Sequence, residues 1–85
     1  MFTLIWYNRA LDALADAFVQ ADLPTREAIE RAVTRLNNRL RSNPNGLGES
    51  RSGPDTRIAF ELPCVITFVV DDADRTVRVT HFWTF

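Results

Sequence analysis

The sequence contains no lysine, one cysteine and one histidine among its 85 residues. A single cysteine excludes an internal disulfide, and Gly46-Leu47-Gly48 followed by Glu49 lacks the lysine of a phosphate-binding glycine loop. No apolar run reaches the roughly 18 residues of a membrane span, and the N-terminus has no signal-peptide pattern. We therefore expect one cytoplasmic domain over residues 1–85, without membrane, metal or cofactor.

Glycine and proline are also scarce, and they are unevenly placed. The segment 43–55 holds all three glycines and two of the four prolines. Such clustering predicts a long loop with turns. Loops of more than about 12 residues in a compact domain are often functional, so this segment is a candidate site.

The charge is nearly balanced overall, at -1, but it is not evenly distributed. Residues 24–57 hold seven arginines against four acidic residues, a net +3, whereas the flanking segments 1–23 and 58–85 are each -2. The middle of the chain is thus a basic segment in an acidic molecule. Arginine is a good bidentate partner for phosphate and carboxylate, although its exclusive use is also consistent with genomic base composition.

Hydrophobic periodicity predicts six elements in the order βααβββ. The expected strands are Phe2–Tyr7, 56–62, 64–70 and 75–85, and the expected helices are about 9–21, with Asn8 as N-cap, and 24–42. The fold class is therefore α+β: a helical hairpin packed on a mainly antiparallel four-stranded sheet. We expect the last three strands to form an antiparallel meander and the first strand to join an edge.

Several segments resemble one known family, the RelE/ParE superfamily of type II toxin-antitoxin toxins, or plasmid-stabilisation proteins. The similarity covers nearly the whole chain. It rests on Leu4-Ile5-Trp6, the helical hairpin, Gly48-Glu49-Ser50-Arg51, Arg57-Ile58 and Trp83. It implies a bacterial toxin that is held by a cognate antitoxin protein. Such toxins either cleave mRNA on the ribosome or inhibit DNA gyrase.

The resemblance has two departures that keep an alternative open. RelE-like nucleases often carry an arginine at the start of the third strand and a tyrosine near the C-terminus. Here Pro63-Cys64 and Phe82-Trp83 stand at those places, and the only tyrosine, Tyr7, is near the N-terminus. We favour inhibition of translation by ribosome-associated mRNA cleavage. The alternative is a ParE-like gyrase inhibitor, or a catalytically degenerate binding module.

Metal-independent RNA cleavage needs a base, an acid and cations for the phosphorane. Our candidates are Glu49, Arg51, Arg57 and His81. Each also has a structural interpretation: Glu49 as a partner of Arg51, Arg57 as a partner of Glu61, and His81 as a core or rim residue. Strict alternation places His81 on the face of Val77, Val79 and Trp83, unless a bulge interrupts the strand.

Four further residues are candidates for RNA or phosphate binding. Arg31, Arg35 and Arg39 recur every four residues on one face of the second helix. They suit ribosomal RNA or an acidic antitoxin segment, and equally a solvated helix face. Trp83 is either a platform for a base or a core residue at the end of a strand.

Overall fold

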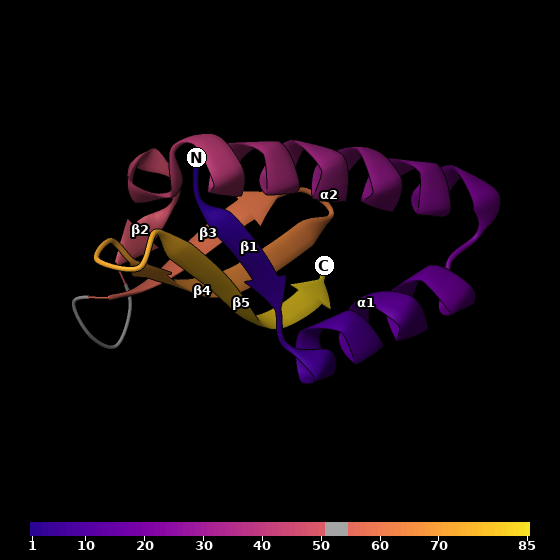
Figure 1. Ribbon diagram of the computed structural model, residues 1–85. Helices are drawn as coiled ribbons and strands as arrows, with labels where there is room; N and C mark the ends of the chain where they lie inside the picture. The colour runs from indigo at the N-terminus through magenta and orange to yellow at the C-terminus, as the bar shows by residue number, and fades with distance from the viewer. Residues whose placement is uncertain (51–54) are drawn as a thin grey trace.

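The computed structural model describes residues 1–49 and 55–85 in full and Ser50 through its backbone. The elements in these ranges are β1 (Thr3–Trp6), α1 (Asn8–Gln20), α2 (Leu23–Ser42), the 3-10 turn η1 (Pro44–Gly46), β2 (Glu49–Ser50), β3 (Thr56–Glu61), β4 (Cys64–Asp71) and β5 (Thr76–Thr84) (Figure 1). The six predicted elements are confirmed, and η1 and β2 are additional.

The strands form one mixed sheet in the order β1-β5-β4-β3-β2. The predicted antiparallel meander of β3, β4 and β5 is confirmed. The first strand joins an edge, as expected, and pairs parallel with β5, with Thr3 opposite Thr76 and Trp6 opposite Val79. The first and last strands of the chain are therefore neighbours in the sheet.

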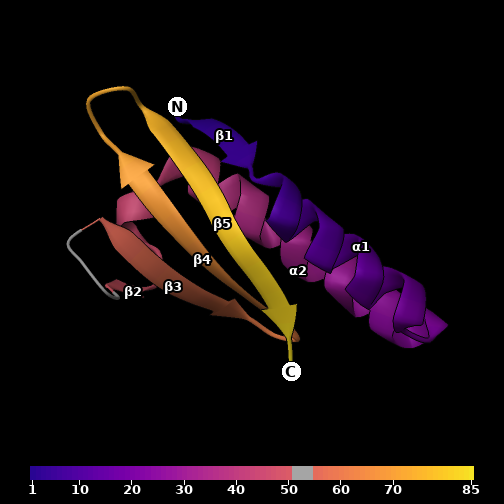
Figure 2. The same cartoon turned by 90° about the horizontal axis from the view of Figure 1, so that it is seen from below.

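Both helices cover the same face of the sheet, and neither lies on the other face (Figure 2). The core lies between the layers, where Ile29, Leu36 and Leu40 of α2 meet Ile66 and Phe68 of β4. Trp6 extends this packing by donating from Nε1 to Oδ1 of Asn37 at 3.0 Å. No helix in residues 1–50 and 55–85 is long and apolar enough to cross a membrane.

Cys64 belongs to this core and is fully buried at the start of β4. Burial, with a smaller contribution from the nearby Glu61 carboxylate, raises the pKa of its thiol to about 11. Because the thiolate is the reactive form, Cys64 acts as a small apolar residue.

Side-chain caps at the turn stabilise the helical hairpin. Arg26 of α2 donates to the carbonyl oxygens of Phe18 and Val19, at 2.8 and 3.0 Å, and so places a cation at the C-terminus of α1. The Asp22 carboxylate accepts from the Thr25 backbone amide at 2.9 Å and caps α2. Hydrogen bonds from the side chain and backbone of Thr25 lower the pKa of Asp22. The predicted cap of α1 was wrong: Tyr7, not Asn8, is its N-cap, without a side-chain hydrogen bond.

A β-bulge divides β5 into two halves. Thr67 pairs with His81, but the next residue of β4, Phe68, pairs with Val79, so Thr80 is the extra residue. Val77 and Val79 therefore face the helices with Phe82, while His81 and Trp83 face the opposite side. The placement of His81 on the face of Val77 and Val79 was therefore wrong, because a bulge interrupts the alternation.

The described part of the predicted loop 43–55 packs against the sheet. Leu47 is buried, and Glu49 and Ser50 pair antiparallel with Ile58 and Arg57. Gly48 makes this approach possible, because it has a φ of +72° and a Cβ built on it would lie 2.1 Å from the carbonyl oxygen of Ile58.

We predict that Gly48→Ala destabilises the protein by at least about 2 kcal/mol, because it adds a left-handed backbone penalty to a backbone clash. Gly46→Ala is the matched control. Its Cβ would meet only the side chain of Asn43, which can turn away, and we expect a loss below about 1 kcal/mol. Urea unfolding followed by circular dichroism measures both. Equal losses in the two variants would contradict this account.

Candidate functional site

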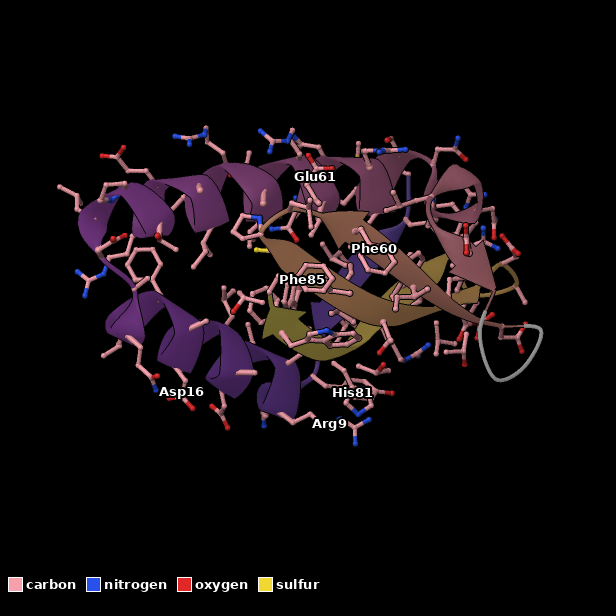
Figure 3. The ribbon with its side chains drawn as sticks, turned by 180° about the vertical axis from the view of Figure 1, so that it is seen from behind. Arg9, Asp16, Phe60, Glu61, His81 and Phe85 are labelled. Atoms are coloured by element: carbon pink, nitrogen blue, oxygen red, sulfur yellow. The ribbon has the colours of Figure 1, made fainter. Side chains whose placement is uncertain are left out.

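The face of the sheet turned away from α1 and α2, here called the open face, carries the exposed side chains of interest. Phe60, Val65 and Trp83 form one row across β3, β4 and β5, and Phe60 stacks on Phe85 with 6.0 Å between ring centroids (Figure 3). Val65 is fully buried although neither helix covers it, whereas Phe60 and Trp83 are 51% and 40% exposed. The aromatic rings thus shield the centre of the sheet and present their own surfaces to solvent.

His81 stands beside this aromatic row. It is exposed and belongs to the next row, with Thr67 of β4 and Ile58 of β3. Residues two apart on a strand share a face, so Trp83 is its neighbour along β5. The structure therefore brings together two of the predicted residues, His81 and Trp83.

Nδ1 of His81 takes part in hydrogen bonds at the bulge. It lies 3.1 Å from the Thr67 hydroxyl oxygen and 3.2 Å from the Thr80 hydroxyl oxygen, and these two oxygens are 2.8 Å apart. Because Nδ1 is occupied by these partners, Nε2 is the ring nitrogen left for a ligand. In the tautomer in which Nδ1 carries the proton, Nε2 is unprotonated, which is the state of a general base.

Two residues that the sequence analysis did not select lie at the same corner of the open face. The Tyr7 amide donates to the Val79 carbonyl at 2.9 Å, and Nε of Arg9 donates to the Thr80 carbonyl at 2.8 Å. Figure 3 shows Arg9 next to His81. The sequence carries no signal for this proximity, because it depends on which edge of the sheet β1 joins.

Glu49 lies on the open face, in the row of His81, but far from it. Direct pairing connects Glu49 to Ile58, Ile58 to Thr67, and Thr67 to His81. Three strand spacings of roughly 4.8 Å separate their Cα atoms by roughly 14 Å. The two side chains therefore do not converge on one phosphate. Arg51 lies outside the described residues.

Arg57 faces the helix side of the sheet and is committed to the chain preceding β2. Its Nε donates to the Leu47 carbonyl and its Nη2 to the Gly48 carbonyl, both at 2.9 Å. These bonds hold the segment in which Gly48 closely approaches the Ile58 carbonyl. The alternative pairing with Glu61 is not formed, because Glu61 pairs with Arg35 of α2.

The three arginines of α2 are remote from His81. Arg31, Arg35 and Arg39 are exposed on a helix that covers the other face of the sheet. Arg35 is further committed to its ion pair with Glu61. Any role of these arginines in binding therefore concerns a surface distinct from the open face.

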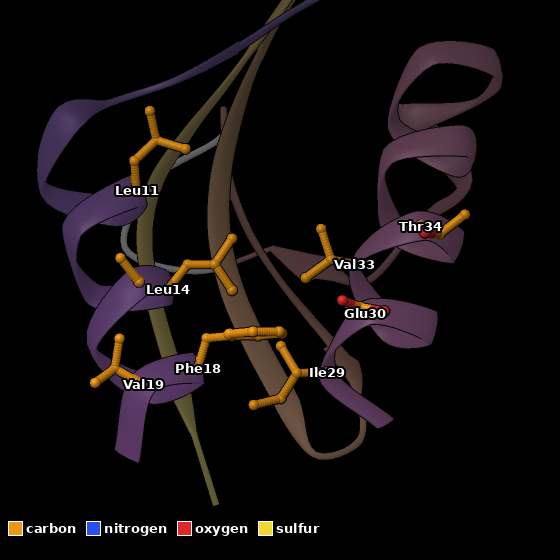
Figure 4. Close-up of a pocket in the computed structure, with 9 residues that line it drawn as sticks. Leu11, Leu14, Phe18, Val19, Ile29, Glu30, Val33 and Thr34 are labelled. Atoms are coloured by element: carbon orange, nitrogen blue, oxygen red, sulfur yellow. The ribbon is translucent and has the colours of Figure 1, made fainter. Parts of the chain in front are cut away.

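A third surface is the apolar groove between α1 and α2, a hollow of about 550 Å³ (Figure 4). Leu11, Leu14 and Phe18 line one side, and Ile29 and Val33 line the other. Val19, at its margin, is 70% exposed. The groove borders a shallower hollow formed by Glu30, Thr34, Arg31 and Arg35, because Glu30 and Thr34 line both. Within residues 1–50 and 55–85, no three potential ligands form a metal site.

Comparison with known proteins finds similarity in structure alone. No family model matches the sequence, and no curated protein matches it. A chain of the RelBE2 toxin-antitoxin complex from Mycobacterium tuberculosis superposes with a TM-score of 0.76 and 20% identity, over 99% of this chain and 98% of that one.

Two further solved structures agree. A chain of the chromosomal ParDE system from P. aeruginosa superposes with a TM-score of 0.75 and 15% identity, over 99% and 96% of the two chains. The isolated E. coli RelE toxin superposes with a TM-score of 0.64 and 19% identity, over 99% of this chain and 84% of that one. The chain therefore has the fold of RelE/ParE toxins, which confirms the predicted fold.

We predict that Arg57→Ala destabilises the protein by about 2 kcal/mol, because it removes two charge-assisted hydrogen bonds to the carbonyls of Leu47 and Gly48. The control is Arg78→Ala. Arg78 is a half-buried residue of β5 without a hydrogen bond to the described residues, and we expect its substitution to change the free energy of unfolding by less than about 0.5 kcal/mol. Chemical unfolding measures both. An Arg57→Ala protein as stable as the control would return Arg57 to the candidates for phosphate binding.

Proposed function

We propose that this protein is the toxin of a toxin-antitoxin pair and that it inhibits translation in the cytoplasm by cleaving mRNA on the ribosome. The likeness of fold to chains of RelBE2, ParDE and RelE supports the toxin assignment. One observation carries the cleavage proposal: His81 is exposed on the open face, with Nδ1 hydrogen-bonded to the hydroxyls of Thr67 and Thr80 and Nε2 left for a ligand.

The proposed reaction needs no metal ion. His81 removes the proton of a ribose 2'-hydroxyl, and the 2'-oxygen attacks the adjacent phosphorus. Trp83 and Phe60 offer aromatic surfaces on which flanking bases stack. Glu49 stays in the proposal as a residue of an outer part of the site that contacts the RNA further along its strand, and Arg51 stays a candidate from the sequence alone.

The second candidate is a binding function without catalysis, either inhibition of gyrase or a toxin fold that only binds. The observation that favours it is the apolar character of the open face. Leu62, Phe60 and Phe85 are 65%, 51% and 79% exposed, and Arg57 is committed to the backbone. Exposed apolar groups of this kind are typical of protein-binding surfaces.

The partner we propose is a small antitoxin encoded nearby, which lays an amphipathic helix in the groove between α1 and α2. Leu11 and Val19 are eight residues apart on α1, or roughly 12 Å along its axis, which matches about two turns of a partner helix. The neighbouring Arg31 offers a cation to the acidic side of that helix. Apolar anchors and acidic flanks are thus the chemistry expected of the antitoxin.

We predict that induced expression arrests bacterial growth and creates new codon-phased 5' ends in mRNA, mapped by primer extension. His81→Gln should lower the yield of these ends at least about a hundredfold, because it removes the general base. Gln20→Ala, exposed at the end of α1, is the control at matched protein level. Full cleavage by His81→Gln would refute the role of His81. Arrest with intact mRNA would favour the binding function.

We predict that Val19→Glu weakens antitoxin binding at least about tenfold, because it places a charge in the groove. Leu23→Glu is the matched control, since Leu23 is equally exposed at 67% but does not line the groove. Calorimetric titration with the protein encoded beside this one measures both. Equal affinities for the two variants would place the antitoxin elsewhere.

A further inference from the structure

The corner of the open face at His81 combines residues from both ends of the chain. Parallel pairing of β1 with β5 places Trp6 opposite Val79, and the chain then continues through Tyr7 into α1. Arg9, in the first turn of α1, therefore lies next to the bulge at Thr80, one residue from His81. Among the described residues, no other arginine donates a hydrogen bond to a residue next to His81.

The bulge explains why Arg9 is held there. A bulged residue is left out of the strand ladder, so the Thr80 carbonyl is available to another donor. Nε of Arg9 takes it at 2.8 Å, and the guanidinium carbon lies 5.6 Å from the centre of the Tyr7 ring. These contacts restrain the guanidinium. Arg9 is exposed, and its two Nη nitrogens have no hydrogen-bond partner among residues 1–50 and 55–85.

We propose that Arg9 binds the phosphate of the RNA that is cleaved at His81, and that a single-stranded RNA is the ligand of this corner. The inference rests on the proposed function and identifies the cation that binds the phosphate at the cleavage site. Arg57 and Arg35 are less suited to this task, because one is bonded to two backbone carbonyls and the other to Glu61. Arg9 is held by one nitrogen and keeps two for a bidentate contact with phosphate.

The cleavage step balances with this arrangement. Nε2 of His81 takes the proton of the 2'-hydroxyl, the O2'–P bond forms, and the P–O5' bond breaks. The departing 5'-oxygen takes a proton from water, and a 2',3'-cyclic phosphate remains. Arg9 donates to the non-bridging oxygens, whose negative charge increases as the phosphorane forms. Trp83, two residues beyond His81, lies where a neighbouring base can stack.

The test measures binding of a single-stranded RNA decamer with 2'-O-methyl riboses, which lacks the attacking hydroxyl and cannot be cleaved. Fluorescence anisotropy gives its affinity. The only histidine of the chain gives an isolated imidazole Hε1 resonance, which reports on occupancy at His81. We expect Arg9→Gln to weaken binding about tenfold or more and to reduce the Hε1 shift at equal RNA concentration.

Arg41→Gln is the control, because it removes the same charge from an exposed position in the last turn of α2. We expect it to weaken binding less than about twofold. Should Arg9→Gln not fold, Arg9→Lys replaces it. This variant keeps the charge and loses the bidentate geometry, and we expect binding about threefold weaker.

Equal binding by the Arg9 and Arg41 variants would overturn the role of Arg9, as would absence of an Hε1 shift in the wild-type protein. Neither result depends on toxicity. Cells in which mRNA stays intact while the purified protein binds the decamer through Arg9 would instead refute the cleavage function and leave the phosphate site standing.

Discussion

The pairing of β1 with β5 is the constraint on which the other features of the molecule depend. A strand of four residues is short, but its parallel register with β5 places Trp6 against the core and directs the chain into α1. Because α1 then packs against β5, the hairpin covers only one face of the sheet. The same pairing brings Arg9 to the bulge. The pairing of β1 with β5 therefore positions the core, the groove and the corner at His81.

The arginines that the structure describes, alike in the sequence, have different tasks in the fold. Arg26 caps the C-terminus of α1, Arg57 holds the segment before β2, and Arg35 joins α2 to the end of β3. These tasks use the fork of donors that a lysine does not have. The basic character of residues 24–57 is therefore partly structural, and net charge alone is a poor guide to where an anion binds.

The fold could be predicted from the sequence because local patterns determine it. Apolar spacing defined both helices, and the continuous run from Cys64 to Val70 marked the central strand. The candidate site was less accessible. Arg57 matched a family pattern but is turned toward backbone carbonyls, and the contact of Arg9 with Thr80 joins residues 71 positions apart. Side-chain direction and edge choice depend on tertiary packing, which periodicity does not report.

The bulge at Thr80 also bears on how this chain tolerates length changes. Loss of that residue would make Val79 and His81 adjacent and restore regular alternation through β5 while leaving the composition almost unchanged. Phe82 would still face the helices, and His81 and Trp83 would still face the open side. The loss would instead remove the carbonyl that Arg9 binds and one of the two hydroxyls beside Nδ1 of His81. The extra residue therefore serves the corner at His81 and not the division of β5 into interior and exterior.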